Sequence, residues 1–163
     1  MPKKLLSLLV IFLMLLAGTS CTAPERVDFS ELLKRTAKLL PEYSFETQDA
    51  FFSDGQWFLF VKTGMEAEIL LTVKEDEYKY AEEVGVSILN TKEEGIIPVA
   101  VKICEAVHKA FVFGKDTEGL LTTLGIYDEN KFFSENTYFA EAGRFRLSFF
   151  NADMGSTVVF KIS

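Results

Sequence analysis

The sequence predicts a single α+β domain: an antiparallel sheet of about 6–8 strands with two to three helices packed on one face. Three observations predict it. A capped segment of helical period begins at Asp28, short alternating apolar segments separated by turn residues follow it, and aromatic residues reach 13%, mostly Phe. A high aromatic content favours a sheet-rich core over a helical bundle. We expect the domain to cover residues 28–163, long enough for a real core.

The first helix has a clear start and stop. Asp28 is expected to be its N-cap and Glu31 completes a capping box, while Val27 and Leu32 occupy the hydrophobic-staple positions. One helical face is apolar, with Lys34, Arg35 and Lys38 expected to face water. The apolar face consists of Phe29, Leu32, Leu33, Thr36, Leu39 and Leu40. Pro41 ends the helix.

Strands follow this helix. The dipeptide Asp54-Gly55 is a strong hairpin signal and joins predicted strands 50–53 and 56–62. In the second of these, Trp57, Leu59 and Val61 share one face, and Phe58 and Phe60 share the other. Further strands are predicted at 66–73, 78–80 and 84–89, and a bulge near 81–83 would join the last two.

The second half begins with helices and ends with strands. A helix is predicted to open at Pro98, in the favoured first position, and to run past Phe111. A shorter helix is expected between an N-cap at Asp116 and a C-cap at Gly125. Strands are predicted at 138–141, 144–150 and 156–162, with a loop over 151–155 between the last two.

The two halves match at an offset of 88 residues, the spacing between Asp28 and Asp116. The other matched pairs are Leu32 and Leu120, Leu33 and Leu121, Phe45 and Phe133, Phe51 and Phe139, Gly55 and Gly143, and Leu59 and Leu147. A duplicated helix-plus-hairpin unit, residues 28–90 and 116–163, would explain them. Chance, with a shared helix-to-hairpin order, is the alternative. A duplicated arrangement resembles the two-repeat domains of the beta-lactamase-inhibitor-protein type, which implies helices on one sheet face and partners on the other.

The N-terminus has the pattern of an export signal over residues 1–20. A basic head, Lys3 and Lys4, precedes an apolar run from Leu5 to Ala17 that is short for a bilayer span. The end of this segment, Gly18-Thr19-Ser20-Cys21, resembles the lipobox of bacterial lipoproteins. That resemblance implies cleavage before Cys21, attachment to its thiol of a diacylglycerol with acyl chains such as palmitate, and a short tether over 21–27.

The resemblance also implies that the domain is exported and lipid-anchored at the outer side of the cell membrane, in the cell envelope. Gly18 stands where the lipobox usually has an aliphatic residue. Ordinary cleavage with secretion, or an uncleaved anchor, therefore stays an alternative.

The charge limits the partners. Removing residues 1–20 takes away Lys3 and Lys4 and no acidic residue, so the formal charge changes from −7 to −9. An acidic domain is repelled by nucleic acids and by anionic membrane surfaces, which excludes both as predicted partners and leaves membrane attachment to the lipid on Cys21. Lipidation of Cys21 would leave Cys104 without a disulfide partner.

Candidate chemistry is sparse. Cys104 and His108 have the i, i+4 spacing of a metal-ligand pair. The sequence after Cys21 contains no other Cys or His that could complete a site. We therefore favour a structural role for both residues over metal binding or nucleophilic catalysis. No Gly-x-Ser-x-Gly elbow or glycine-rich phosphate loop is present. The sequence therefore predicts no catalytic residue, no metal and no cofactor. The carboxylate clusters, the calcium-like run Asp128-Glu129-Asn130 among them, are interpreted as solvated turns.

Aromatic side chains suggest a binding surface. Trp57, Phe58 and Phe60 place large apolar groups on both faces of one strand, and a face left uncovered would offer them, with Tyr78 and Tyr80, to a ligand. Arg144 and Arg146 are expected to point to the same face of the sheet, which predicts cross-strand ion pairs or recognition of an anion.

We therefore expect a non-catalytic binding domain for a protein, peptide or glycan, and not an enzyme. A carboxylate-dependent hydrolase and a structural or inhibitory interaction protein are the alternatives.

Overall fold

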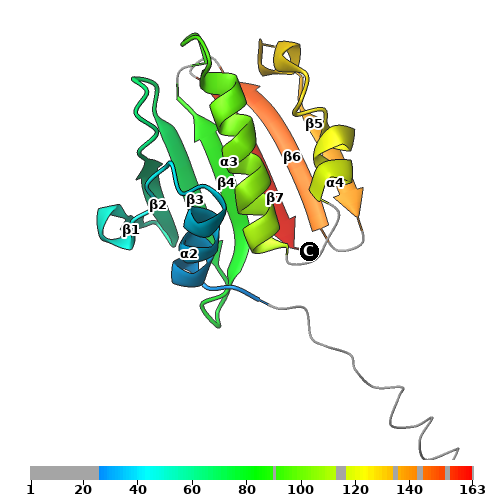
Figure 1. Cartoon of the computed structure of the whole chain (residues 1–163). Helices are drawn as coiled ribbons and strands as arrows, with labels where there is room; N and C mark the ends of the chain where they lie inside the picture. The colour runs from blue at the N-terminus through cyan, green and yellow to red at the C-terminus, as the bar shows by residue number, and fades with distance from the viewer. Residues whose placement is uncertain are drawn as a thin grey trace, which may run out of the picture.

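The computed structural model describes residues 26–89, 91–112, 117–133, 136–142, 145–152 and 155–162. Over these ranges the fold is α+β, as predicted (Figure 1). The helices are α2 (Phe29–Leu39), α3 (Ile96–Phe111) and α4 (Thr117–Leu124), with two 3-10 turns, η1 (Thr47–Asp49) and η2 (Glu129–Phe133). The predicted signal segment 1–20, Cys21, Asp116, Gly143 and Arg144 lie outside the described residues.

One antiparallel sheet of seven strands forms the centre of the domain, within the predicted range. The strands are β1 (Phe51–Ser53), β2 (Gln56–Val61), β3 (Ile69–Glu75), β4 (Ala81–Ile88), β5 (Tyr138–Ala142), β6 (Phe145–Ala152) and β7 (Gly155–Ile162). Their spatial order is β1-β2-β3-β4-β7-β6-β5. The middle strand β4 therefore pairs with β3, its neighbour in the chain, and with β7, the last strand.

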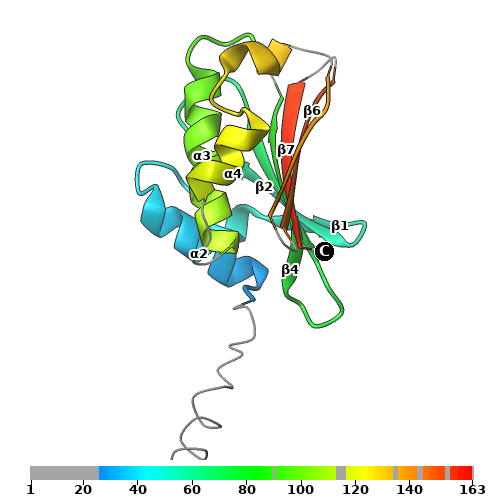
Figure 2. The same ribbon diagram turned by 90° about the vertical axis from the view of Figure 1, so that its right-hand side faces the viewer.

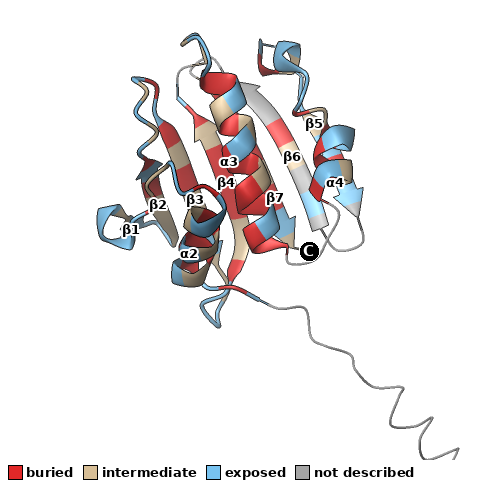
Figure 3. Cartoon of the chain, viewed as in Figure 1, coloured by how far each residue is buried: buried red, intermediate tan, exposed pale blue. Residues whose placement is uncertain are grey.

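The three helices cover one face of the sheet (Figure 2). Buried residues gather where α3 lies over the central strands (Figure 3), and Ile103 and Val107 of this helix are fully buried. The strands present Val84, Val86 and Phe160 to the same core. No helix in the described part of the chain covers the opposite sheet face, so the core is one-sided.

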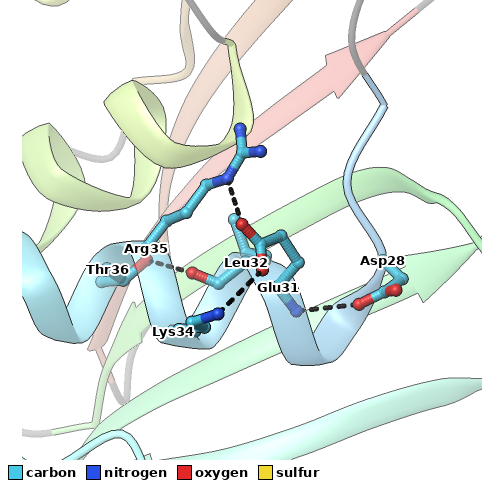
Figure 4. A network of polar contacts seen from close by, with 6 residues as sticks. All are labelled: Asp28, Glu31, Leu32, Lys34, Arg35 and Thr36. Atoms are coloured by element: carbon cyan, nitrogen blue, oxygen red, sulfur yellow. Dashed lines mark hydrogen bonds and ion pairs between the residues drawn. The ribbon is translucent and has the colours of Figure 1, made fainter.

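The helix α2 begins as predicted. Its N-cap is Asp28, whose carboxylate accepts a hydrogen bond from the Glu31 backbone N–H at 2.8 Å (Figure 4). Val27 and Leu32, the staple pair, are both buried. Because Phe29 stacks on Trp57 with ring centroids 4.7 Å apart, the first turn of α2 is held directly on β2.

One predicted strand and one predicted strand start are wrong. Residues 78–80 form a turn and no strand: the Asp76 carboxylate accepts from the backbone N–H groups of Tyr78 and Tyr80, and Lys79 has φ +67°. The strand predicted from residue 66 begins at Ile69, because the Glu93 carboxylate accepts from the backbone N–H groups of Glu66 and Ala67. The predicted bulge is confirmed, since Lys74 pairs with Glu83 but Glu75 pairs with Ala81.

The start of α3 was also misplaced. The helix begins at Ile96, after Gly95 with φ +83°, so Pro98 occupies its third position and not its first. A proline is tolerated there because the N–H groups of a first turn have no partner within the helix. The C-cap at Gly125 is confirmed, with φ +78° and its N–H bonded to Leu121 and Thr122 carbonyls. The loop expected over 151–155 is shorter, because β6 and β7 pair up to Ala152 and Gly155.

The strand order argues against a duplicated unit. The hairpins β1-β2-β3 and β5-β6-β7 approach β4 from opposite edges, while corresponding strands run in the same direction. A rotation that superposes one set on the other would turn the sheet over and move its helix to the other face. Because α2 and α4 lie on the same face (Figure 2), the topology of one half is the reflection of the other, and no rotation superposes the two halves as repeats.

Candidate functional site: the open sheet face

The sheet face that the helices leave uncovered, here called the open face, is defined by the strand register. One row of side chains crosses it through six strands, since paired residues point to the same side of a sheet. This row consists of Phe58, Thr72, Gly85, Val159, Ser148 and Phe139. Aromatic rings therefore border the open face on both sides, and short side chains lie between them.

One border is an aromatic patch formed by Phe51, Phe58 and Phe60. Phe51 stacks on Phe58 with ring centroids 5.1 Å apart and planes 11° from parallel. Phe51 and Phe60 are 49% and 41% exposed, although they belong to hydrogen-bonded strands. A rigid sheet thus presents three phenyl rings to solvent on its helix-free side.

The structure separates the predicted trio. Phe58 and Phe60 lie on the open face, but Trp57 points to the helix side, where it stacks on Phe29 and meets Phe52 edge-on. Tyr78 and Tyr80 lie in the β3–β4 turn, with Tyr80 facing Arg26, and do not extend the patch. Sequence reasoning missed Phe51, although the Asp54-Gly55 turn fixes its pairing with Phe58.

The middle of the open face is a floor of small polar groups. The hydroxyls of Ser87 and Thr157 are 2.9 Å apart and hydrogen-bonded. A Cβ atom added at Gly85 would lie against the Thr72 hydroxyl, so glycine keeps this part of the floor low. Hydroxyl groups can both donate and accept, which suits a polar ligand lying across the strands.

Charged residues border the floor at one end. Lys161 pairs with Glu83 at 3.4 Å, and Arg146 pairs with Glu141 at 3.5 Å while lying 4.7 Å above the Phe139 ring. Lys74 contacts Glu82 at 2.8 Å, and this hydrogen bond raises the pKa of Lys74. The cross-strand ion pair predicted for Arg146 is confirmed.

Cys104 and His108 are both buried in α3. Burial raises the pKa of the Cys104 thiol and lowers the pKa of His108 to about 4. The His108 ring packs against Phe160, and its Nδ1 lies 2.9 Å from the Thr117 hydroxyl. Its Nε2 has no hydrogen-bond partner among the described residues. A protonated thiol and a neutral ring in the core fit the structural role that the sequence indicated.

Among the described residues, carboxylates also converge at the start of β3. Glu66, Glu68 and Glu93 line a groove of about 490 Å³ between the start of β3 and the end of β4, together with Lys92. The Glu93 carboxylate is engaged by the backbone N–H groups of Glu66 and Ala67 and so helps to build the groove. Within the described ranges, no three His, Cys, Asp or Glu side chains are grouped closely enough to hold a metal ion.

Comparison of the chain with protein-family models, curated proteins and solved structures gave no match. None of the helices in the described part of the chain combines the length and apolar composition needed to cross a bilayer.

The buried His108 predicts a loss of stability in acid. Its pKa of about 4 in the folded chain lies below the ordinary 6.5, so the unfolded chain binds more protons as the pH falls between these values. We expect the free energy of unfolding to fall by up to about 3 kcal/mol more in the wild type than in His108→Gln between pH 7 and pH 4. Urea unfolding followed by the fluorescence of the single tryptophan, Trp57, measures this. Equal pH dependence in both proteins would contradict it.

Proposed function

We propose that the chain is a membrane-tethered lipoprotein of the cell envelope, and that its α+β domain binds a protein, peptide or glycan on the open face without catalysis. The observation that carries this proposal is the aromatic patch of Phe51, Phe58 and Phe60 on a sheet face without helices. The patch belongs to regular strands, so its rings are held in place before any ligand arrives.

Exposed aromatic surface favours binding. A ligand that removes a phenyl ring from water stabilises the complex by about 25 cal/mol per Å² of apolar area buried. Three adjacent rings beside a floor of hydroxyls offer both apolar contact and hydrogen bonds. Because strands fix these groups, little conformational entropy is lost on binding.

The anchor belongs to the same proposal. Asp28, the N-cap of α2, lies seven positions after Cys21, a stretch of chain that spans at most about 25 Å when extended. A lipid on Cys21 would therefore hold the domain close to the bilayer and raise its concentration near ligands at the envelope. Two acyl chains suffice for stable attachment, whereas one binds only marginally.

In the part of the chain that the structure describes, the hydrolase alternative could use the groove lined by Glu66, Glu68 and Glu93. A general acid needs a carboxyl whose pKa is raised. Glu93 accepts hydrogen bonds from the backbone N–H groups of Glu66 and Ala67 and so holds the segment before β3 in place. This environment supports a structural role for Glu93 and leaves binding at the open face as the better-supported function.

The anchor predicts a simple change in cell fractionation. Cys21→Ala removes the thiol to which the diacylglycerol would be attached, so we expect the protein to lose lipid labelling and to accumulate as the unprocessed form. Inhibition of lipoprotein signal peptidase by globomycin should also leave the wild type uncleaved, but with the lipid still attached to Cys21. Cys104→Ala is the matched control, since this thiol is buried. Unchanged lipid labelling of Cys21→Ala would disprove the anchor.

The open face predicts position-specific crosslinking. A photoreactive phenylalanine analogue at position 60 should capture an envelope component in living cells, because Phe60 lies in the aromatic patch. The same analogue at position 133 is the control, since Phe133 is 63% exposed but lies in η2, away from the patch. Mass spectrometry identifies the adducts. Identical adducts at both positions, or none at position 60, would count against the proposed binding face.

A further inference from the structure

The helix side of the domain contains a basic groove that the proposed binding face does not use. It has a volume of about 590 Å³ and lies between α2 and α3. The side chains that line it include four cations from two helices and one carboxylate. They are Lys34, Arg35 and Lys38 of α2, Lys109 of α3, and Glu31.

The charge of this groove is opposite to that of the chain. Four cations and one carboxylate leave a local charge of +3, whereas the whole chain has a formal charge of −7. Glu31 accepts a hydrogen bond from Arg35 Nε at 2.8 Å and lies 3.9 Å from Lys34 Nζ, as Figure 4 shows. Its pKa is lowered, chiefly by the hydrogen bond from Arg35. The single carboxylate is thus already shared between two cations.

Lys38 and Lys109 have no carboxylate within 4.0 Å among the described residues. Each lies in the last turn of its helix, where a cation also suits the helix dipole. The dipole accounts for each lysine separately but not for the convergence of both with Lys34 and Arg35. Like charges held together repel each other, and a multivalent anion in the groove would relieve this repulsion.

The groove also has an apolar component. Leu39 is 48% exposed at its edge, and Ala110 of α3 lines it. Guanidinium and ammonium groups are the usual partners of phosphate, and exposed aliphatic groups suit the glycerol and upper acyl carbons of a lipid. An anionic phospholipid headgroup combines these chemistries in one molecule.

The position of the groove fits this ligand. Figures 1 and 2 place α2 and the C-terminal end of α3 at the end of the molecule where the described chain begins. Phe29 lies eight positions after Cys21, a reach of at most about 28 Å, and the 11 residues of α2 add about 16 Å. The β3–β4 turn at the same end has acidic Glu75 and Glu77, so an anionic surface would favour contact through the helices.

We propose that the groove between α2 and α3 binds the phosphate headgroup of an anionic phospholipid and orients the tethered domain with its helices against the membrane. The open face then points away from the bilayer. This inference rests on the proposed function, because the lipid anchor on Cys21 supplies the high concentration of the domain at the membrane surface. The acidic net charge, which argued against anionic membranes at the sequence level, acts weakly here because charges beyond a Debye length of about 8 Å are screened.

The test uses the full lipidated chain with an environment-sensitive fluorophore on Ser30→Cys, an exposed position on α2 beside the lysines. The anchor protects the Cys21 thiol and burial protects Cys104. The protein is inserted into vesicles of phosphatidylcholine alone or with 30 mol% phosphatidylglycerol, and a lipid-borne quencher reports docking. Co-sedimentation measures the anchor separately, so an unanchored protein is distinguished from an anchored protein that does not dock.

We expect strong quenching in the anionic vesicles and little in the neutral ones. Lys38→Gln with Lys109→Gln should weaken docking roughly 25-fold, about fivefold for each cation. Lys74→Gln with Lys161→Gln is the matched control, because it removes the same charge from the open face, which points away from the bilayer, and should change docking less than twofold. Equal quenching in both vesicle types, or equal losses in both double variants, would overturn the proposal.

Inorganic phosphate at 10 mM distinguishes the source of the anion. We expect it to leave docking to anionic vesicles nearly unchanged, because a lipid surface presents many headgroups at once. If phosphate alone abolishes docking in the wild type and shifts the fluorophore spectrum in neutral vesicles, the ligand is a free phosphate and the lipid assignment is wrong.

Discussion

The pairing of β4 with β7 holds the domain together. It joins Val84, Val86 and Ile88 to the last strand of the chain, with about 70 residues between paired positions such as Ser87 and Thr157. Without this pairing, the sheet would divide into β1–β4 and β5–β7, and the edge strands β4 and β7 would be left without a hydrogen-bonded neighbour on one side. Because closing so long a loop costs entropy before any contact is gained, the apolar core under α3 must compensate for it.

That pairing also creates the surfaces with candidate functions. It places Phe58 and Phe139 at opposite borders of one row and leaves short side chains between them. The helices that stabilise the other face cannot cover both sides, so the aromatic patch stays exposed. On the helix side, the crossing of α2 and α3 over the sheet brings cations from separate segments into one groove. The packing of the helices on one sheet face thus leaves the aromatic patch on the open face and the basic groove on the helix side of the domain.

Local features could be predicted from the sequence, because neighbouring residues determine them. The Asp28 cap, the Asp54-Gly55 hairpin and the Gly125 helix end each depend on a few adjacent residues, and all are confirmed. The start of β3 was misplaced because it is set by Glu93, 26 residues away from Ala67. Tyr78 and Tyr80 have the composition of a strand, but their backbone N–H groups donate to the Asp76 carboxylate, which holds them in a turn.

The candidate sites show the same limit. Alternation placed Phe58 and Phe60 on one face correctly, but only the fold shows that Trp57 faces α2. The convergence of Lys109 with Lys38 depends on helix packing, which no local pattern encodes. The 88-residue match illustrates the opposite error. It reflected a real helix-to-hairpin order in both halves, yet strand order and direction make the topology of one half the reflection of the other.

The binding function proposed for the open face requires that a ligand cover its aromatic patch in the envelope. Carbene footprinting of the full lipidated protein, in intact cells and after purification, measures this directly as the labelling of individual side chains. Our account predicts that labelling of Phe51, Phe58 and Phe60 falls several-fold in cells, while labelling of Phe133 is unchanged. Equal labelling of the three patch residues in both states would contradict it.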